Sequence, residues 1–198
     1  MKKNWLSYIC MAVLLSGILS SCNESSFLDL KDPNHFTGDN FWKNKADAES
    51  ALAAAYSPIK YQIYGYFGAF DGWLNLNGRG DDIFTITNEE PGMWAIANFQ
   101  NSPTTGNDPY GALFTGVQRA NVVLRYIDNV PATGITEEDR SMIKGEALFL
   151  RGYQYFLLVN NYKEVPLRII PSNEDEPNKP AASEAVLWKQ AEDDLTEA

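Results

Sequence analysis

Two tryptophans in a loop-like stretch of the chain lie close in sequence to short polar side chains. The stretch runs from Tyr61 to Gly106 and is rich in glycine, asparagine and aromatic residues. An indole offers a flat apolar face, and nearby amide, guanidinium or carboxylate groups can bind hydroxyls, so together they suit a sugar ring. The candidate groups are Trp94 with Asn98 and Gln100, and Trp73 with Asn75, Asn77 and Arg79. The alternative is that each tryptophan packs its loop onto the rest of the fold.

Catalytic and metal-binding chemistry has little support in the residue types. A serine-hydrolase triad needs a histidine base, and the single histidine, His35, lies in an extended entry segment. The acidic pairs Asp81–Asp82 and Glu89–Glu90 consist of adjacent residues, whereas the two carboxylates of a glycosidase face each other across a cleft. The sequence has no histidine or cysteine cluster and no calcium-type loop. We therefore predict a protein that is not an enzyme and has no metal site or cofactor.

The amino terminus has the pattern of an export signal. Lys2 and Lys3 precede an apolar run, Leu6–Leu19, that is too short to span a bilayer, and small serines then lead to Cys22. This ending resembles a bacterial lipobox, in which cleavage before the cysteine leaves it acylated. We expect a signal peptide at 1–21, followed by the lipidated Cys22 and an extended tether to residue 40. The alternative is an ordinary secretory signal that happens to end in a cysteine.

Composition agrees with an exported globular protein. The only other cysteine, Cys10, lies within the signal, so the mature chain has no disulfide framework and must be stabilised by its core. Removal of Lys2 and Lys3 leaves 14 basic against 26 acidic residues, a net charge of −12. Binding to phosphates needs clustered Lys and Arg residues. The sequence lacks such clusters, so nucleic acid is excluded as a partner. An acidic surface also gives no attraction toward anionic lipid head groups.

The segments on either side of the loop-like stretch have helical spacing. Asn44 is a good N-cap for a first helix, which Pro58 is expected to end. A second helix is predicted over 109–129, with Asp108 as its cap and Pro109 in its first turn. Its apolar positions form one stripe of residues: Leu113, Val117, Ala120, Leu124 and Ile127. Between these helices the sequence predicts loops and one short strand at 83–87.

Two further helices are predicted in the last third of the chain. Thr136 and Asp139 resemble a capping box that opens a helix ending near Tyr162, and this largely apolar helix should be the centre of the core. It should pack antiparallel to helix 109–129, since the connecting loop is short. Within it Arg151 is interpreted as a buried ion-pair partner and an aromatic set as core: Tyr153, Tyr155, Phe156 and Tyr162. The last helix, capped by Ser183, should bury the stripe Leu187, Ala191, Leu195 and Ala198.

Three sequence blocks resemble the SusD/RagB family of glycan-binding surface lipoproteins. They are FLDLKDPNHFTGDNFWKNKADAESALAAAY at 27–56, PYGALFTGVQRANVVLRYIDNV at 109–130 and EALFLRGYQYFLLVNNYKEVPL at 146–167. One departure is Lys163, where the family usually has glycine. The resemblance favours Trp94 with Asn98 as ligand-binding residues. The segment Arg79-Gly80-Asp81-Asp82 also resembles a family segment, which we interpret as structural first and ligand-binding second, and Arg79 and Asp82 join Trp73 as candidates in that second role. It also implies that the chain is the amino-terminal part of a protein of about 500 residues.

The resemblance sets the expectations for fold and function. It implies an all-α scaffold of tetratricopeptide-like helix pairs with long decorating loops, occupying 41–198 and incomplete at its carboxyl end. The expected function is capture of oligo- or polysaccharide at the outer membrane and delivery to a SusC-like TonB-dependent transporter. Two alternatives stay open, namely a RagB-like protein that binds peptide or another nutrient, and a structural lid of the transporter with no ligand of its own.

Overall fold

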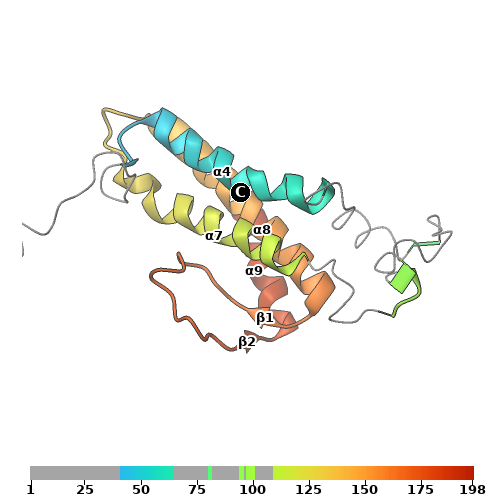
Figure 1. Ribbon diagram of the computed structural model, residues 1–198. Coiled ribbons are helices and arrows are strands. Elements are labelled where there is room, and N and C mark those ends of the chain that lie inside the picture. Colours follow the sequence, from blue (N-terminus) through green and yellow to red (C-terminus); the bar gives the residue numbers. More distant parts are fainter. Residues whose placement is uncertain (1–40, 65–79, 82–93, 96, 101–108) are drawn as a thin grey trace, which may run out of the picture. The chain divides into compact units, whose positions relative to one another are not determined.

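The computed structural model (Figure 1) describes residues 41–64, 80–81, 94–95, 97–100 and 109–198. All of these residues lie in the unit Gly38–Ala198. Its elements in chain order are α4 (Lys45–Tyr64), α7 (Tyr110–Tyr126), the 3₁₀ turn η2 (Ile127–Asn129), α8 (Glu137–Tyr162), β1 (Val165–Pro166), β2 (Ala181–Ala182) and α9 (Glu184–Glu197). The expected mainly helical fold is confirmed. The expected signal, tether and strand at 83–87 lie outside the described residues.

Helix α8 is the centre of the core, as its composition predicts. It packs against α4, α7 and α9, and Figure 1 shows α4 and α7 running alongside it. One group of buried side chains lies between α4, α7 and the first half of α8, and includes Trp42, Leu52, Ile127 and Leu150. A second group joins the other half of α8 to α7, β1 and α9, with Tyr155 fully buried. The two groups fix all four helices to one another.

The predicted caps of α4 and α8 are confirmed. The side-chain oxygen of Asn44 accepts a hydrogen bond from the backbone N–H of Asp47 at 3.1 Å, and the Asp47 carboxylate accepts from the N–H of Asn44 at 3.2 Å. At α8, the Thr136 hydroxyl accepts from the Asp139 N–H at 3.1 Å and donates to the Asp139 carboxylate at 2.8 Å. Each cap satisfies N–H groups that a helix start leaves without partners, so both helices begin where the sequence indicates.

The prediction that Pro58 ends the first helix is wrong, because α4 continues through Pro58 to Tyr64. Proline has no N–H, so it leaves the carbonyl of the residue four positions earlier, Ala54, without its helical donor. The guanidinium of Arg119 on α7 donates to that carbonyl at 2.9 Å and to the Ser57 hydroxyl at 3.1 Å. A side chain from a second helix therefore replaces the hydrogen bond that proline removes.

Three smaller details of the helices also differ from the sequence-based expectations. Pro109 occupies the N-cap of α7 and not its first turn. Ser183 occupies the N-cap of α9, but its side chain makes no capping hydrogen bond. Three expected core residues are exposed: Phe156 at 42%, Leu195 at 43%, and Ala198. In the last stripe Asp194 takes the buried position that was expected of Leu195. The sequence also gave no sign of the antiparallel β1–β2 pair, in which Val165 lies opposite Ala182.

Candidate functional site

Trp94 and Asn98 lie on one short helical turn. The backbone N–H of Asn98 donates to the Trp94 carbonyl at 3.0 Å, and the Asn98 side-chain amide donates to the same oxygen at 2.7 Å. Residues four apart lie on one flank of a helical turn, so the four-residue spacing brings these two candidates together as a pair. Trp94 is 38% exposed. The turn thus presents a partly exposed tryptophan, Trp94, beside the Asn98 amide, and a hydrogen bond to the Trp94 carbonyl holds that amide in place.

The end of this turn has an unusual residue. The N–H of Gln100 donates to the Ala95 carbonyl at 2.7 Å, which is the long hydrogen bond of a Schellman motif. Phe99 occupies the left-handed position of that motif with φ 56°, and 73% of it is exposed. The sequence analysis did not select Phe99. No sequence pattern distinguishes Phe99, because its left-handed backbone conformation is known only from the structure.

The other predicted site residues are not placed. Trp73, Arg79, Asp82 and the lipidation candidate Cys22 lie outside the described residues, as does the cap candidate Asp108. Their roles stay predictions.

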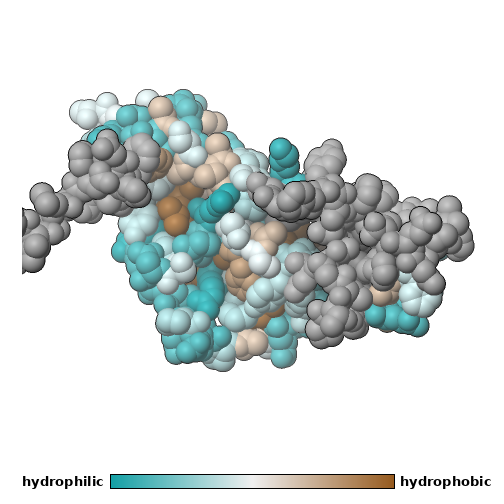
Figure 2. Space-filling view, viewed as in Figure 1, coloured by the Kyte–Doolittle hydropathy of each residue, from teal (hydrophilic) through white to brown (hydrophobic). Residues whose placement is uncertain are grey.

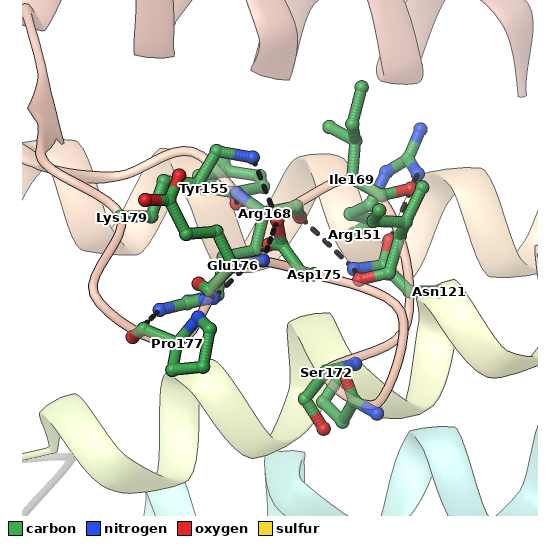
Figure 3. Close-up of polar contacts among 12 residues, drawn as sticks. Asn121, Arg151, Tyr155, Arg168, Ile169, Ser172, Asp175, Glu176, Pro177 and Lys179 are labelled. Carbon is green, nitrogen blue, oxygen red and sulfur yellow. Dashed lines mark hydrogen bonds and ion pairs between the residues drawn. The ribbon is translucent and has the colours of Figure 1, made fainter.

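Arg151 is the buried ion-pair partner that the sequence predicts. Its guanidinium makes two hydrogen bonds to the carboxylate of Asp194 on α9, at 2.7 and 2.8 Å, and the two side chains are 10% and 3% exposed. It also donates to the Asn121 side chain of α7 at 3.0 Å and to the Ile169 carbonyl at 3.3 Å. Figure 3 shows Arg151 and Asn121 meeting below the loop at Ile169. These partners all lie within the fold, so the cluster joins α7, α8 and α9 and has a structural role.

The loop after β1 is held by a second set of polar contacts. The Tyr155 hydroxyl donates to the Arg168 carbonyl at 2.9 Å and accepts from the Arg168 N–H at 2.6 Å, and burial raises the pKa of this tyrosine well above its usual range. The Asn121 amide donates to the carbonyls of Arg168 and Ile170. Consecutive carbonyls of the loop are therefore bound by side chains of α7 and α8.

Asp175 is the acid at the centre of the same loop (Figure 3). Its side chain is 4% exposed and accepts from Arg168 and Lys179, both at 3.1 Å. Burial acts to raise the pKa of this carboxyl, but the hydrogen bonds from Lys179 and the Glu176 N–H, with the charges of Lys179 and Arg168, lower it below its ordinary value. A stable carboxylate with internal partners has a structural role.

Neither a metal site nor a membrane-spanning helix is found among the residues that the structure describes. In that part of the chain no group of three His, Cys, Asp or Glu side chains could hold a metal ion. No helix that the structure describes is both long and apolar enough to cross a bilayer. In the view of Figure 2, hydrophilic side chains cover much of the described surface and hydrophobic ones form small patches. The exposed aromatic turn with Trp94, Asn98 and Phe99 is our candidate site among the described residues.

Comparison with known proteins agrees with this fold. The curated SusD-like protein P38 of Formosa agariphila is 27% identical over 173 residues, which are 84% of this chain and 31% of the relative. A SusD superfamily structure from Bacteroides vulgatus matches with a TM-score of 0.67 and 27% identity, over 80% of this chain and 35% of that one. A laminarin-binding SusD-like protein matches with a TM-score of 0.65 and 28% identity, over 79% and 34%. The chain thus spans about a third of the length of these relatives.

The family assignment covers most of the chain. Residues 26–198 match the SusD-like family described as "Starch-binding associating with outer membrane". That match includes all four described helices, and the resemblance drawn from three sequence blocks is confirmed. The chain belongs to the SusD-like family of outer-membrane-associated binding proteins, which are not enzymes.

Proposed function

We propose that this chain is the amino-terminal part of a cell-surface lipoprotein that captures oligo- or polysaccharide and delivers it to a SusC-like TonB-dependent transporter. The observation that carries the proposal is the family match over residues 26–198, in a family described as starch-binding. It is supported by the laminarin-binding relative, which is 28% identical and has the same fold. The exposed turn at Trp94 supplies an aromatic surface with the chemistry that such a ligand requires.

Capture in this proposal combines stacking with polar recognition. The exposed part of Trp94 covers the apolar face of a sugar ring, and Asn98 binds ring hydroxyls with the amide oxygen and the N–H that do not take part in its bond to the Trp94 carbonyl. Trp73, Arg79 and Asp82 contribute a second indole and charged groups for further hydroxyls. Because the Asn98 amide is already bonded to the Trp94 carbonyl, the pair is preorganised and loses little freedom on binding.

Anchoring and delivery depend on the amino terminus and on the partner. We propose that residues 1–21 are removed, that Cys22 is acylated and that residues 22–40 form the tether to a helical domain at 41–198. Each buried CH₂ of an acyl chain contributes about 0.8 kcal/mol, so two or three chains hold the protein at the membrane. The helices then form the rigid scaffold that presents ligand-binding loops to the transporter.

Affinity electrophoresis of the full-length, unlipidated protein tests the glycan-binding proposal. Wild type, Trp94→Ala and Trp73→Ala are run through gels that contain plant, algal or host polysaccharides, with starch and laminarin included. Phe149→Ala is the matched control, because Phe149 is an exposed aromatic residue of α8 outside the candidate turn. We expect one glycan to retard wild type and Phe149→Ala equally, and Trp94→Ala less.

The other outcomes separate the remaining possibilities. Equal retardation of all four proteins would place the binding site outside this segment of the protein. If no glycan retards wild type, the glycan-binding proposal is wrong, and binding to peptides, measured by pull-down, then distinguishes a RagB-like binder from a structural lid.

A further inference from the structure

Phe99 adopts a backbone conformation that its side chain disfavours. Among the residues that the structure describes, only Phe99 and Lys163 have positive φ angles without being glycine. At Phe99 the angle is 56°, in the left-handed region, where the Cβ of an L-residue crowds its own backbone. Its place at the end of a helical turn is the one at which glycine is strongly favoured. The backbone of this turn would therefore be more easily formed without the Phe99 side chain.

Packing does not compensate for this cost. Phe99 is 73% exposed, which is more than any other large hydrophobic residue in the described part of the chain. A Schellman motif is often supported by a hydrophobic contact, but that contact involves the residue after the left-handed one, and here this residue is the polar Gln100. Neither local conformation nor burial explains a phenylalanine here. Strain of this kind, held on an exposed aromatic residue, is typical of positions used for binding.

We propose that Phe99 is a ligand-contacting residue that offers a second aromatic face to the apolar side of a sugar ring. This inference rests on the proposed function and adds a residue to the same site. A phenyl ring has no hydrogen-bonding group, so it can recognise only the C–H face of a sugar or another apolar surface. Phe99 directly follows Asn98, whose amide is bonded to the Trp94 carbonyl at 2.7 Å. The turn thus carries an indole, an amide and a phenyl ring within six residues.

The left-handed conformation also fixes the direction in which the Cα–Cβ bond of Phe99 leaves the backbone. A residue in this region has few allowed backbone states, and the bonds on both sides, from Asn98 to Trp94 and from Gln100 to Ala95, close the turn around it. Because the backbone that carries the phenyl ring is held in this way, only the side-chain torsions of Phe99 need ordering when a ligand binds. Glycine at the same position would keep the backbone and remove the face.

The variant Phe99→Gly tests the proposal, because it keeps the backbone conformation of the turn and removes the phenyl ring. Phe99→Gly is compared with wild type by affinity electrophoresis in the polysaccharide that retards the full-length, unlipidated protein most, with laminarin and starch as fixed probes. We expect binding to weaken about tenfold, which corresponds to about 1.4 kcal/mol. The thermal midpoint should stay the same or rise, because glycine relieves the strain. Phe99→Tyr should bind as wild type does, since it keeps the ring.

Lys163→Gly is the matched control. It makes the same backbone change at the other positive-φ residue, at the end of α8, and should leave glycan binding unchanged. If Trp94→Ala weakens retardation but Phe99→Gly does not, the role of Phe99 is refuted while the proposed function stands. A clear fall in the thermal midpoint of Phe99→Gly would show a packing role and would also refute it. If no polysaccharide retards wild type, the proposed function fails and this inference fails with it.

Discussion

Removal of Asp194 should destabilise the protein more than any exposed substitution. Asp194→Ala leaves the Arg151 guanidinium, 10% exposed, without its carboxylate partner in a buried position. Breaking a buried pair by removing one partner costs about 3–5 kcal/mol, because the remaining charge is neither solvated nor paired. For a protein of this size each kcal/mol lowers the thermal midpoint by about 2–4 °C, so the expected loss is roughly 6–20 °C.

Replacing both charges should cost less than removing one. In the double variant Arg151→Met with Asp194→Leu no buried charge remains. The Asn121 side-chain oxygen and the Ile169 carbonyl each lose a donor, at 3.0 and 3.3 Å in the native structure. Asn121 is 1% exposed, whereas Ile169 is 45% exposed and its carbonyl can bind water, so only the Asn121 oxygen is left as an unsatisfied buried acceptor. One such acceptor costs about 1–3 kcal/mol, so the double variant should lose about that much and less than Asp194→Ala. The two substitutions are therefore expected to be strongly non-additive.

Urea denaturation of wild type, both single variants and the double variant measures these free energies of unfolding. Asp193→Ala is the matched control, because the neighbouring carboxylate forms only an exposed pair with Lys189 and should cost at most about 1 kcal/mol. An equal cost for Asp194→Ala and Asp193→Ala would show that the buried pair contributes no more than an exposed one. A double-variant cost equal to the sum of the two single costs would show that no uncompensated charge is created by breaking the pair.

Three further substitutions have expected outcomes. Gly134→Ala should lower the thermal midpoint, because an added Cβ would lie 2.4 Å from the backbone oxygen of Lys43, and overpacking of this kind costs about 1–3 kcal/mol; unchanged melting would contradict this. Lys163→Gly should raise the thermal midpoint slightly. Lys163 has φ 66° in a tight turn closed by a 2.7 Å hydrogen bond from the Glu164 N–H to the Tyr162 carbonyl, and glycine relieves this strain while losing only an exposed ion pair with Glu184. A lower midpoint would show that the ion pair contributes more than the strain costs. Asp175→Asn should flatten the acid side of a plot of stability against pH. The pKa of Asp175 is lowered in the folded state, so its contribution is present above the unfolded value of 3.8 and is lost as the pH falls through the folded value; equal slopes for wild type and variant in acid would argue against it.

Local signals predicted the starts of the helices well. The caps at Asn44 and Thr136 depend on residues three positions away, so the sequence contains all that is needed. The end of α4 was missed for the opposite reason. Its continuation past Pro58 depends on Arg119, which is 65 residues from the Ala54 carbonyl that it satisfies. No local pattern could show that a side chain of another helix supplies this hydrogen bond.

The sequence also could not show which side chains of the last helix, α9, are buried. Leu187 and Ala191 are buried, but the third position could be Asp194 or Leu195, since both spacings suit a helix. Hydrophobicity favours Leu195, and the acidic run around Asp194 suggests a solvated face. The structure buries Asp194 because Arg151, 43 residues away, needs a partner there. The sequence predicted the buried arginine correctly but could not identify its acid.

The scaffold and the candidate turn are stabilised by different kinds of contact. The loop at Arg168–Ile170 is held by side chains from two helices, whereas the hydrogen bonds that the turn at 94–100 makes with described residues are all internal to it. Substitutions in the first region should therefore lower the free energy of unfolding, while those at Trp94 or Phe99 should change glycan affinity at nearly constant stability. A variant of the turn that loses both together would show that its aromatic side chains belong to the core and not to a binding site.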